Sequence, residues 1–463
     1  MAELQYAGEY DITHCKILTT SGQEFDILPV VQDIVIFESI FSQSISGTIT
    51  IQDTSDIVNN GPIIGEEKLQ IKLLTPQENE RPETIIDFVK TPLDIYKIGA
   101  FMGDGEKATV VTLHFASQEV YKNAVSKISR SYKGSCSEIV DKIFRDKEYL
   151  DSDKKLNLEE TNGLKKIIFP SMKPFKAIDM LCRQSNSKNF KNSPTYLFYE
   201  TTKSYNFRSV DGLCSQEPIM EYEENVPDRI VAGGKNIETN LKTINDFTIV
   251  APRDTTQNIY EGMLSSNIKV HDIYNKKINY FTYNYFDEFD NDTHLEKKPY
   301  VSETKDKISN KGLADYSNAV DFVTITSSAK SFDETSNTEA GIETVYPYAP
   351  DDLEKIIMRR TSRLRQFQNS ITLNMTVPGN TSIQAGDVLQ ITIGASSTVT
   401  DRTNDPNYTG RYLITKIRHN FNNGSAEVRH TINMTVVKDS VDYDYPNSFV
   451  QYENKGTKET ILI

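Results

Sequence analysis

Cysteine and long apolar runs are both scarce in this 463-residue sequence. The four cysteines include no CxxC pair, which fits reduced thiols in a cytosol better than a disulfide framework; they are Cys15, Cys136, Cys182 and Cys214. No stretch approaches about 18 consecutive apolar residues, so we expect no membrane-spanning segment. The first residues, Met1–Tyr10, have neither a basic region nor an apolar run, so we expect no signal peptide.

The sequence also lacks catalytic motifs and sets of metal ligands. It contains no Walker A motif, no GxGxxG after a strand, no HExxH and no GxSxG. The six histidines are scattered. His419 and His430 flank an Asn423-Gly424 turn and would be diagonal neighbours across a hairpin, but two nitrogens without a third ligand make a weak metal site. We interpret both as surface histidines, and we expect no enzymatic activity, no cofactor and no metal.

The charge is acidic overall and unevenly distributed. The net charge is −14, which does not suit a general nucleic-acid binder, because binding to phosphates needs clustered Lys and Arg. Residues 119–216 hold 18 Lys and Arg against 12 Asp and Glu, a balance of +6, so the remainder carries −20. This asymmetry indicates a distinct middle domain that docks electrostatically on a partner.

A β-pattern occurs twice, about 320 residues apart. Ile95–Phe115 matches Ile414–Met434 without a gap, including Lys97 with Lys416 and Phe115 with Met434. Two shorter pairs of segments precede it in the same order: Leu69–Leu73 with Leu389–Ile393, and Ser46–Ile51 with Ser370–Met375. The period is too long for a solenoid, so we interpret it as a duplicated domain with one strand order.

Glycines mark the turns of both copies. Gly65 and Gly386 precede the shorter matching strands, and Gly105 and Gly424 follow Asp or Asn at the tips of the expected hairpins. Asp-Gly and Asn-Gly tolerate the positive φ that tight hairpin turns need. We therefore expect these four glycines to be structural turn residues.

The sequence predicts a β-rich α+β multidomain protein. Two similar β-barrel-like modules are separated by an α+β domain, and the second module is interrupted by an insertion. The expected bounds are 1–118 for the first module, 119–225 for the α+β domain, 226–250 with 369–437 for the second module, 251–368 for the insertion, which ends in a helix over 351–368, and 438–463 for a polar tail.

Two features of the insertion admit two interpretations each. Arg359 and Arg363 share one face of the expected helix and either contact a partner subunit or phosphate, or form an exposed face that pairs with nearby acids. The aromatic run that contains Tyr283 and Tyr285 is either an interface patch or a half-buried strand, with Phe281, Tyr283 and Tyr285 on one side and Tyr280, Thr282 and Asn284 on the other.

The domain order resembles a known group of phage proteins. The segments that carry the resemblance are Ser46–Asp53 with Gly65–Leu74, Leu93–Ser117 followed by a helix, and Ile383–Gly394 with Thr409–Val437. In this order the chain resembles the central baseplate hub protein of contractile-tailed, T4-like bacteriophages and the wider group of late-control and injection-needle hub proteins. The resemblance covers nearly the whole chain and lies in arrangement, not in a single residue.

The resemblance implies a homotrimer whose six tail-tube-like β-modules form a pseudo-sixfold ring in the tail baseplate of a virion, assembled in the host cytoplasm. Such a ring joins the tail tube, or a tube-initiator protein, to a trimeric spike, and baseplate wedge proteins contact it. DNA passes through its lumen without specific binding during genome ejection. The sequence reaches Ile463 without the long β-repeat of a spike, so the spike is expected to be a separate protein.

A second function stays open at this stage. The chain would be a tail-associated cell-wall hydrolase if residues 119–216 formed its catalytic domain. A hydrolase needs carboxylates or a metal that converge in a pocket, whereas a hub needs threefold contacts and an axial opening.

Overall fold

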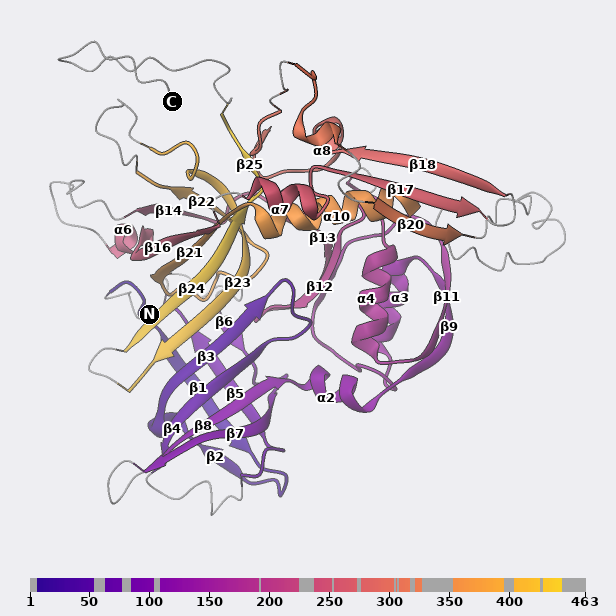
Figure 1. Cartoon of the computed structure of the whole chain (residues 1–463). Helices are drawn as coiled ribbons and strands as arrows, with labels where there is room; N and C mark the ends of the chain where they lie inside the picture. Colours follow the sequence, from indigo (N-terminus) through magenta and orange to yellow (C-terminus); the bar gives the residue numbers. More distant parts are fainter. Residues whose placement is uncertain are drawn as a thin grey trace, which may run out of the picture.

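The computed structural model of the chain describes residues 6–53, 63–76, 85–103, 109–190, 193–224, 237–251, 254–272, 276–303, 305, 308–316, 321–326, 353–394, 404–424 and 428–443. The chain is β-rich, with one large, mainly antiparallel sheet and few helices. In Figure 1 the large sheet runs along one side of the molecule, and α3 (Cys136–Arg145) and α4 (Pro174–Gln184) lie together on the other.

The first strand set comes from the N-terminal quarter of the chain. Its order is β3-β4-β8-β7-β5-β1-β2, with β6 beside β5, and all neighbours are antiparallel. A short 3-10 helix, η1 (Leu28–Val30), precedes β3. The strands are β1 Asp11–Leu18, β2 Glu24–Asp26, β3 Val31–Ser39, β4 Ser46–Asp53, β5 Lys68–Leu74, β6 Ile85–Asp87, β7 Leu93–Gly103 and β8 Thr109–Ser117.

The second strand set is assembled from two distant parts of the chain. Its order is β16-β21-β24-β23-β22-β14-β15, antiparallel except that β14 runs parallel to both β22 and β15. The strands are β14 Met220–Glu224, β15 Thr243–Ile244, β16 Asp246–Ala251, β21 Ile371–Pro378, β22 Val388–Thr392, β23 Gly410–Asn422 and β24 Arg429–Lys438.

The two sets repeat one pairing order. The run β4-β8-β7-β5 in the first set has the same connections as β21-β24-β23-β22 in the second, and β3 flanks β4 as β16 flanks β21. The sets differ at one margin, where β1 is antiparallel to β5 but β14 is parallel to β22.

A bulge recurs at the same place in both sets. The register shifts between Ile95 and Lys97 in β7, and between Ile414 and Lys416 in β23. A bulge adds one residue and bends its strand, so it is a specific feature that unrelated strands do not share by default. The coincidence supports the sequence match of the two long strands.

The register corrects the ungapped match of the strands that follow the hairpins. Ile95 pairs with Phe115, whereas Ile414 pairs with Val436. Phe115 therefore corresponds to Val436, and the expected correspondence with Met434 is wrong by two residues. The match of Ser46–Ile51 with Ser370–Met375 is also wrong by two, because Gly47 pairs with Phe115 and Leu373 with Val436. Because side chains alternate between the two faces of a strand, a shift of two preserves the inward and outward pattern, which is why the sequence did not reveal it.

The two sets are joined edge to edge within the chain. The second half of β23 pairs with β3, from Lys416 opposite Ser39 to Asn422 opposite Asp33. This pairing makes a continuous antiparallel run of eight strands, β7-β8-β4-β3-β23-β24-β21-β16. Figure 1 shows β3 and β23 side by side at the centre of this run.

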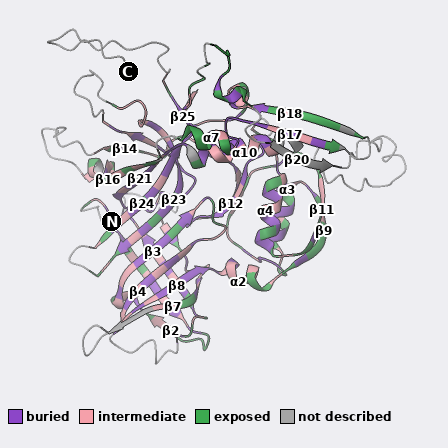
Figure 2. Ribbon diagram, viewed as in Figure 1, coloured by how far each residue is buried: buried purple, intermediate pink, exposed green. Residues whose placement is uncertain are grey.

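Each strand set covers an apolar core. In the first core, every second residue of β4, and of β8 from Val111 to Phe115, is buried, for example Ile49 and Leu113. Phe421 of β23 belongs to this core, although its strand lies in the second set. Figure 2 shows the buried residues following these strands. Burial of alternate β-branched residues is the main source of strand stability, so this pattern explains why the predicted strands form.

The region between the sets is a small α+β unit with its own core. Ser135 begins α3 with a capping box to Glu138, and Pro174 occupies the first turn of α4, where proline is tolerated. The expected boundary at 225 assigns β14 to this unit, whereas the structure pairs β14 with β22 in the large sheet. Its elements are α2 Gln118–Val125, β9 Ile128–Gly134, α3, β10 Leu156–Leu158, β11 Lys165–Met172, α4, β12 Tyr196–Glu200, β13 Tyr205–Ser209 and α5 Val210–Cys214.

The insertion contributes a three-stranded sheet and a long helix. The small sheet has the order β18-β17-β20, and α10 packs against β17 and β18. The expected helix over 351–368 is α10 (Leu353–Asn369). The remaining elements are α6 Ile237–Leu241, α7 Thr255–Tyr260, β17 Ser265–Asp272, β18 Lys277–Asn284, α8 Tyr285–Glu288, η3 Phe289–Asn291, β19 Lys298–Pro299, η4 Leu313–Asp315, β20 Asp321–Thr326 and β25 Ser440–Val441.

All four cysteines are buried free thiols. Among the described helices, none combines the length and apolar character needed to cross a lipid bilayer. Most of the expected polar tail, with its end at Ile463, lies outside the described residues.

Candidate functional site

The face of the eight-stranded run that points away from the cores carries a groove of about 500 Å³. Strands from both sets contribute to it: β3, β4, β16, β21, β23 and β24. Its outward side chains include Phe37, Asp246, Thr248, Asn374, Thr376, Lys416, Arg418, Asn433 and Thr435. The groove is therefore a property of the joined sheet, and neither strand set forms it alone.

The groove is polar but carries little net charge. Thr435 donates a hydrogen bond to Asn374 across β24 and β21 at 2.8 Å, and Asn433 donates to Thr376 at 3.2 Å. Such cross-strand pairs keep the neutral side chains engaged with one another. A face of Thr and Asn offers hydrogen bonds to water, but not the cluster of cations that binds a phosphate backbone.

The charged groups at the groove are few. Lys416 and Arg418 are exposed on β23, and Asp246 is exposed on β16. The Arg418 guanidinium lies 5.7 Å from the centre of the Phe37 ring, a cation–π contact across the junction of the two sets. None of the site residues predicted from the sequence lines this groove. The available signal was the run of Thr and Asn at every second position of β21 and β24.

His419 and His430 lie under this sheet, and the expectation of surface histidines is wrong. Both are fully buried, and His419 Nδ1 lies 3.2 Å from His430 Nε2, as diagonal neighbours across the hairpin. Burial lowers the pKa of His419 to about 3 and the pKa of His430 well below its usual range, so both are neutral at pH 7. The alternation of His419 with the inward Ile417 and Phe421 was the signal that it faces the core.

Glu38, near the C-terminal end of β3, binds two other parts of the chain. It accepts hydrogen bonds from the backbone N–H of Thr202 at 2.7 Å and of Ala385 at 2.8 Å. Burial raises the pKa of Glu38 to about 6, although these bonds favour its charged form. Its carboxylate is 4.0 Å from His419 Nε2, but the neutral imidazole makes this a polar contact and not an ion pair.

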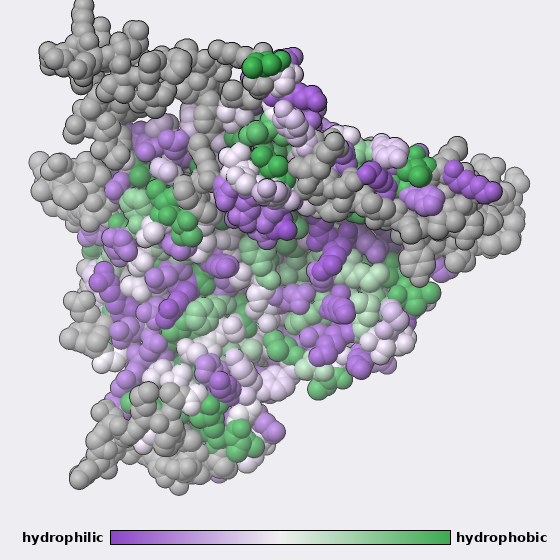
Figure 3. All heavy atoms as spheres, in the orientation of Figure 1, coloured by the Kyte–Doolittle hydropathy of each residue, from purple (hydrophilic) through white to green (hydrophobic). Residues whose placement is uncertain are grey.

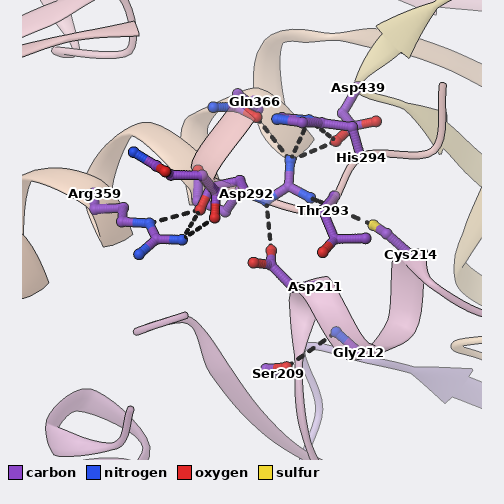
Figure 4. Close-up of polar contacts among 12 residues, drawn as sticks. Ser209, Asp211, Gly212, Cys214, Asp292, Thr293, His294, Arg359, Gln366 and Asp439 are labelled. Atoms are coloured by element: carbon purple, nitrogen blue, oxygen red, sulfur yellow. Dashed lines mark hydrogen bonds and ion pairs between the residues drawn. The ribbon is translucent and has the colours of Figure 1, made fainter. Parts of the chain in front are cut away.

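A buried ionic cluster joins three distant segments around Arg363. Arg363 is fully buried and forms ion pairs with Asp439, which follows β24, and with Asp211 of α5 at 3.1 Å. His294 lies 2.8 Å from Asp439, and Arg363 also donates to Gln366 at 2.8 Å. Figure 4 shows these side chains converging from α5, α10 and the segment at 292–294.

The charges in this cluster compensate one another. Burial works against the charged guanidinium, but Asp439 and Asp211 outweigh it and raise the pKa of Arg363. Burial also works against the Asp439 carboxylate, and Arg363 with His294 outweighs it and lowers the pKa of Asp439. For Asp211 the burial effect is larger than the attraction of Arg363, so its pKa is raised. The cluster is an internal junction of the fold.

The expected arginine face and aromatic patch lie mostly inside the chain. The interpretation of Arg363 as an exposed residue is wrong, and its interior position leaves no surface there for a partner. Arg359 is paired with Asp292 at 2.6 Å. Tyr283 lies in β18 and is 5% exposed, whereas Tyr280 of the same strand is 68% exposed, which matches the alternative of a half-buried strand. Tyr285 is fully buried too, but it begins α8, so its expected place in the strand is wrong.

The four predicted turn glycines differ in conformation. Gly65 and Gly386 have positive φ, +96° and +92°, as a turn glycine requires. Gly424 does not belong to the positive-φ glycines, so the expectation of a left-handed residue at this tip is wrong. A side chain at Gly424 would instead approach Gln32. Gly105 lies outside the described residues.

The carboxylates of the middle region are used internally. Glu119 and Glu200 are buried and converge on the Lys154 ammonium, at 2.8 and 2.7 Å. Burial raises the pKa of Glu200 despite this partner. In the part of the chain that the structure describes, no group of three or more His, Cys, Asp or Glu side chains has the geometry to hold a metal ion.

No protein-family model matches the chain, and no curated protein matches it. Solved structures of tail proteins share its fold. One is a tail protein from Neisseria meningitidis MC58, 11% identical, with a TM-score of 0.52, covering 93% of this chain and 97% of that chain. Another is the 43 kDa tail protein of prophage MuSo2 from Shewanella oneidensis, 8% identical, with a TM-score of 0.50, covering 93% and 99%. The resemblance to phage tail proteins is thus confirmed at the level of the fold.

Proposed function

We propose that the chain is the structural hub of a phage tail baseplate. Three copies form a ring that joins a sixfold tail tube, or its initiator, to a threefold cell-puncturing spike, and the ring surrounds the path by which DNA leaves the virion. The observation that carries the proposal is the repeated strand order, with its shared bulge, in a chain that has the fold of two tail proteins.

The repeated order supports two similar modules in each chain. In the first module the long bulged strand β7 lies between β8 and β5. In the second module the long bulged strand β23 lies between β24 and β22. Three chains then supply six modules, which is the number that a sixfold tube presents. The modules differ in most residues, so the ring is pseudo-sixfold.

The remaining parts of the chain occur once and therefore follow the threefold symmetry. The α+β unit and the insertion with α10 both lie beside the large sheet (Figure 1). Three copies of such a unit have the symmetry of a trimeric spike, whereas the six modules have the approximate symmetry of a sixfold tube. In this way the chain would connect the sixfold symmetry of the tube to the threefold symmetry of the spike.

The polar groove suits a surface past which DNA moves. Its side chains include many Thr and Asn, and its exposed charges are two cations, Lys416 and Arg418, and one anion, Asp246. A cationic lining would retain DNA through phosphate contacts and counterion release, and a strongly apolar lining would be poorly hydrated. We assign this face to the lumen of the ring.

The alternative of a cell-wall hydrolase has less support. The carboxylates Glu119 and Glu200 of residues 119–216 are buried and share the Lys154 ammonium as a partner, whereas a general acid must reach its substrate. Peptidoglycan clearing by the purified chain, abolished by Glu119→Gln or Glu200→Gln in a variant that keeps its fold, would favour the hydrolase instead.

Sedimentation velocity followed by electron microscopy tests the hub. We expect a particle with three times the 52.6 kDa mass of the chain, and a threefold ring with an axial opening. A stable monomer, a hexamer, or a closed particle without an opening would contradict the proposal.

A further inference from the structure

Among the described residues, the eight-stranded run has two edges without a full partner strand. The edge of β7 that faces away from β8 is paired with β5 only at Leu93 and Asp94. Next to them, the Ile95 N–H donates a hydrogen bond to the Glu67 carbonyl oxygen at 2.8 Å. From Lys97 to Gly103, no described strand lies on that edge. At the other end, β16 pairs with β21, and its outer edge likewise has no partner strand in the described ranges.

The chain itself shows how such edges are paired. Inside the molecule, the half of β23 that extends beyond β22 pairs with β3, with Arg418 opposite Phe37 and His419 opposite Ile36. The strand β23 is the second-set counterpart of β7, and β3 is the first-set counterpart of β16. The two open edges therefore correspond to the two strands that already pair at the internal junction.

The registers give the counterparts residue by residue. Counting through β4 and β21, Ile34 corresponds to Phe247, Val35 to Thr248 and Ile36 to Ile249. Counting through β8 and β24, Phe101 corresponds to His419 and Met102 to Asn420, because β7 carries a second irregularity between Ile98 and Phe101.

We propose that β7 of one chain pairs antiparallel with β16 of the next copy of this chain. The register copied from the internal junction sets Phe101 opposite Ile249 of the next copy, and Met102 opposite Thr248. This inference rests on the proposed hub, and it names the surface by which the ring closes.

The burial of the two counterpart strands supports the pairing. Ile34 and Ile36 of β3, which have neighbours on both edges, are fully buried. Their counterparts in β16, Phe247 and Ile249, pack on the second core but are only partly buried. A strand from another copy would cover these residues as β23 covers β3. An open strand edge exposes its backbone N–H and C=O groups, so pairing satisfies them as well.

The strand directions permit closure. The eight strands alternate in direction, so β7 and β16 of one chain run opposite to each other. When a rotation relates neighbouring copies, β16 of one copy therefore runs antiparallel to β7 of the next copy. The contact joins two different surfaces, and such a contact forms a closed ring only if the rotation returns to its start.

Disulfide cross-linking tests the pairing and its register. The variant with Met102→Cys and Thr248→Cys places two thiols opposite each other on adjacent strands, where Cα atoms lie roughly 4.5–5.5 Å apart, within disulfide range. The four native cysteines are buried and should not compete. We expect oxidation to convert monomer to reducible dimers and trimers without larger species.

A matched variant tests the register, and one measurement needs no substitution. Met102→Cys with Asp246→Cys moves one thiol by two residues, about 7 Å along the strand, and should cross-link at least tenfold more slowly. In the unmodified protein, amide hydrogens of 97–103 and 246–251 should exchange at least about tenfold more slowly in the assembled than in the dilute state.

The outcomes separate this inference from the hub proposal. A trimer with neither cross-links nor slower exchange on these edges would overturn the pairing and leave the hub intact. Cross-linked trimers that bind neither tube nor spike would uphold the pairing and contradict the hub. A chain that stays monomeric, or that forms open polymers, would overturn the ring closure.

Discussion

Arg363 is the largest side chain that the structure buries completely, and its position shows how charge stabilises the interior. A buried cation is costly unless it is paired and hydrogen-bonded. Arg363 meets this condition with Asp439, Asp211 and Gln366. These partners come from α5, from α10 and from the chain after β24. The cluster therefore fixes the α+β unit, the insertion and the second strand set relative to one another.

We predict that Arg363→Met lowers the free energy of unfolding by about 3–5 kcal/mol, because it leaves two buried carboxylates without their cation. Chemical denaturation measures the loss. Arg365→Met is the matched control on the same helix. Its side chain is 37% exposed and pairs with Glu261 at 3.2 Å, so a loss within about 0.5 kcal/mol is expected. Equal losses in the two variants would contradict the assigned role.

Glu38 introduces a pH dependence of stability. Its pKa is raised from 4.5 to about 6 by burial, so the folded state holds the proton more tightly than the unfolded state. Its contribution is present below pH 4.5 and is lost as the pH rises through about 6. At about 1.4 kcal/mol per pH unit, the expected loss is about 2 kcal/mol. Unfolding measured from pH 4.5 to 7 gives this slope.

The variant Glu38→Gln isolates this contribution. Burial also raises the pKa of Asp387 to about 6, so the contribution of Asp387 to the free energy of unfolding is lost in the same pH window. The slope should therefore decrease in Glu38→Gln by about 2 kcal/mol over the window without disappearing. An unchanged slope would show that Glu38 does not titrate there.

At the scale of the element, the turn before β22 depends on one glycine. Gly386 has φ +92°, and a Cβ at this position would overlap the Tyr199 hydroxyl. The turn therefore needs glycine for its backbone angle and also for its close contact with the α+β unit. Turns on the outer surface need only the first property.

We predict that Gly386→Ala lowers the free energy of unfolding by about 2–4 kcal/mol, from backbone strain together with the overlap. Gly22→Ala is the control for strain alone. Gly22 has φ +84° and nothing within 4 Å of the added Cβ, so a loss of about 1–2 kcal/mol is expected. Thermal denaturation compares the two variants, and equal losses would mean that the contact with Tyr199 is unimportant.

At the scale of the whole molecule, the proposed ring gives the polar groove of the joined sheet a position. Figure 3 shows polar side chains interspersed with apolar groups over the visible face. The groove of the joined sheet, with Thr248, Asn374 and Asn433, lies on the side away from the two cores. In a ring closed through β7 and β16, this side would be continuous from chain to chain.

We predict that the assembled protein does not retain duplex DNA at about 150 mM salt, and that lysines in the groove change this. Thr248→Lys with Asn374→Lys and Asn433→Lys should create binding that weakens steeply with salt, because each lysine displaces counterions from phosphate. Fluorescence anisotropy measures the affinity. The control adds the same charge at the exposed β1–β2 turn, with Thr20→Lys, Ser21→Lys and Gln23→Lys. Equal binding in both variants would contradict a groove that faces DNA.

The sequence by itself determined the strands and the faces of their side chains. Alternation in segments such as Ser46–Asp53 is a local property, and it follows from the two-residue period of a strand. The match of Leu69–Leu73 with Leu389–Ile393 holds in the structure, since Leu69 pairs with Leu93 and Leu389 with Tyr412, next to the matching bulges. Local pattern and order along the chain sufficed for these features.

Only the tertiary structure decided which strands became neighbours. A two-residue shift leaves every face unchanged, so the pairing of Ile414 with Val436 could not be read from the pattern. The pairing of β23 with β3 joins residues nearly 400 positions apart. The burial of Arg363 required Asp211 and Asp439 to meet it from distant segments. Periodicity specifies which face of a strand is buried and which is exposed. The strand that pairs with a given edge, and the side chain that pairs with a buried charge, depend on how the whole chain packs.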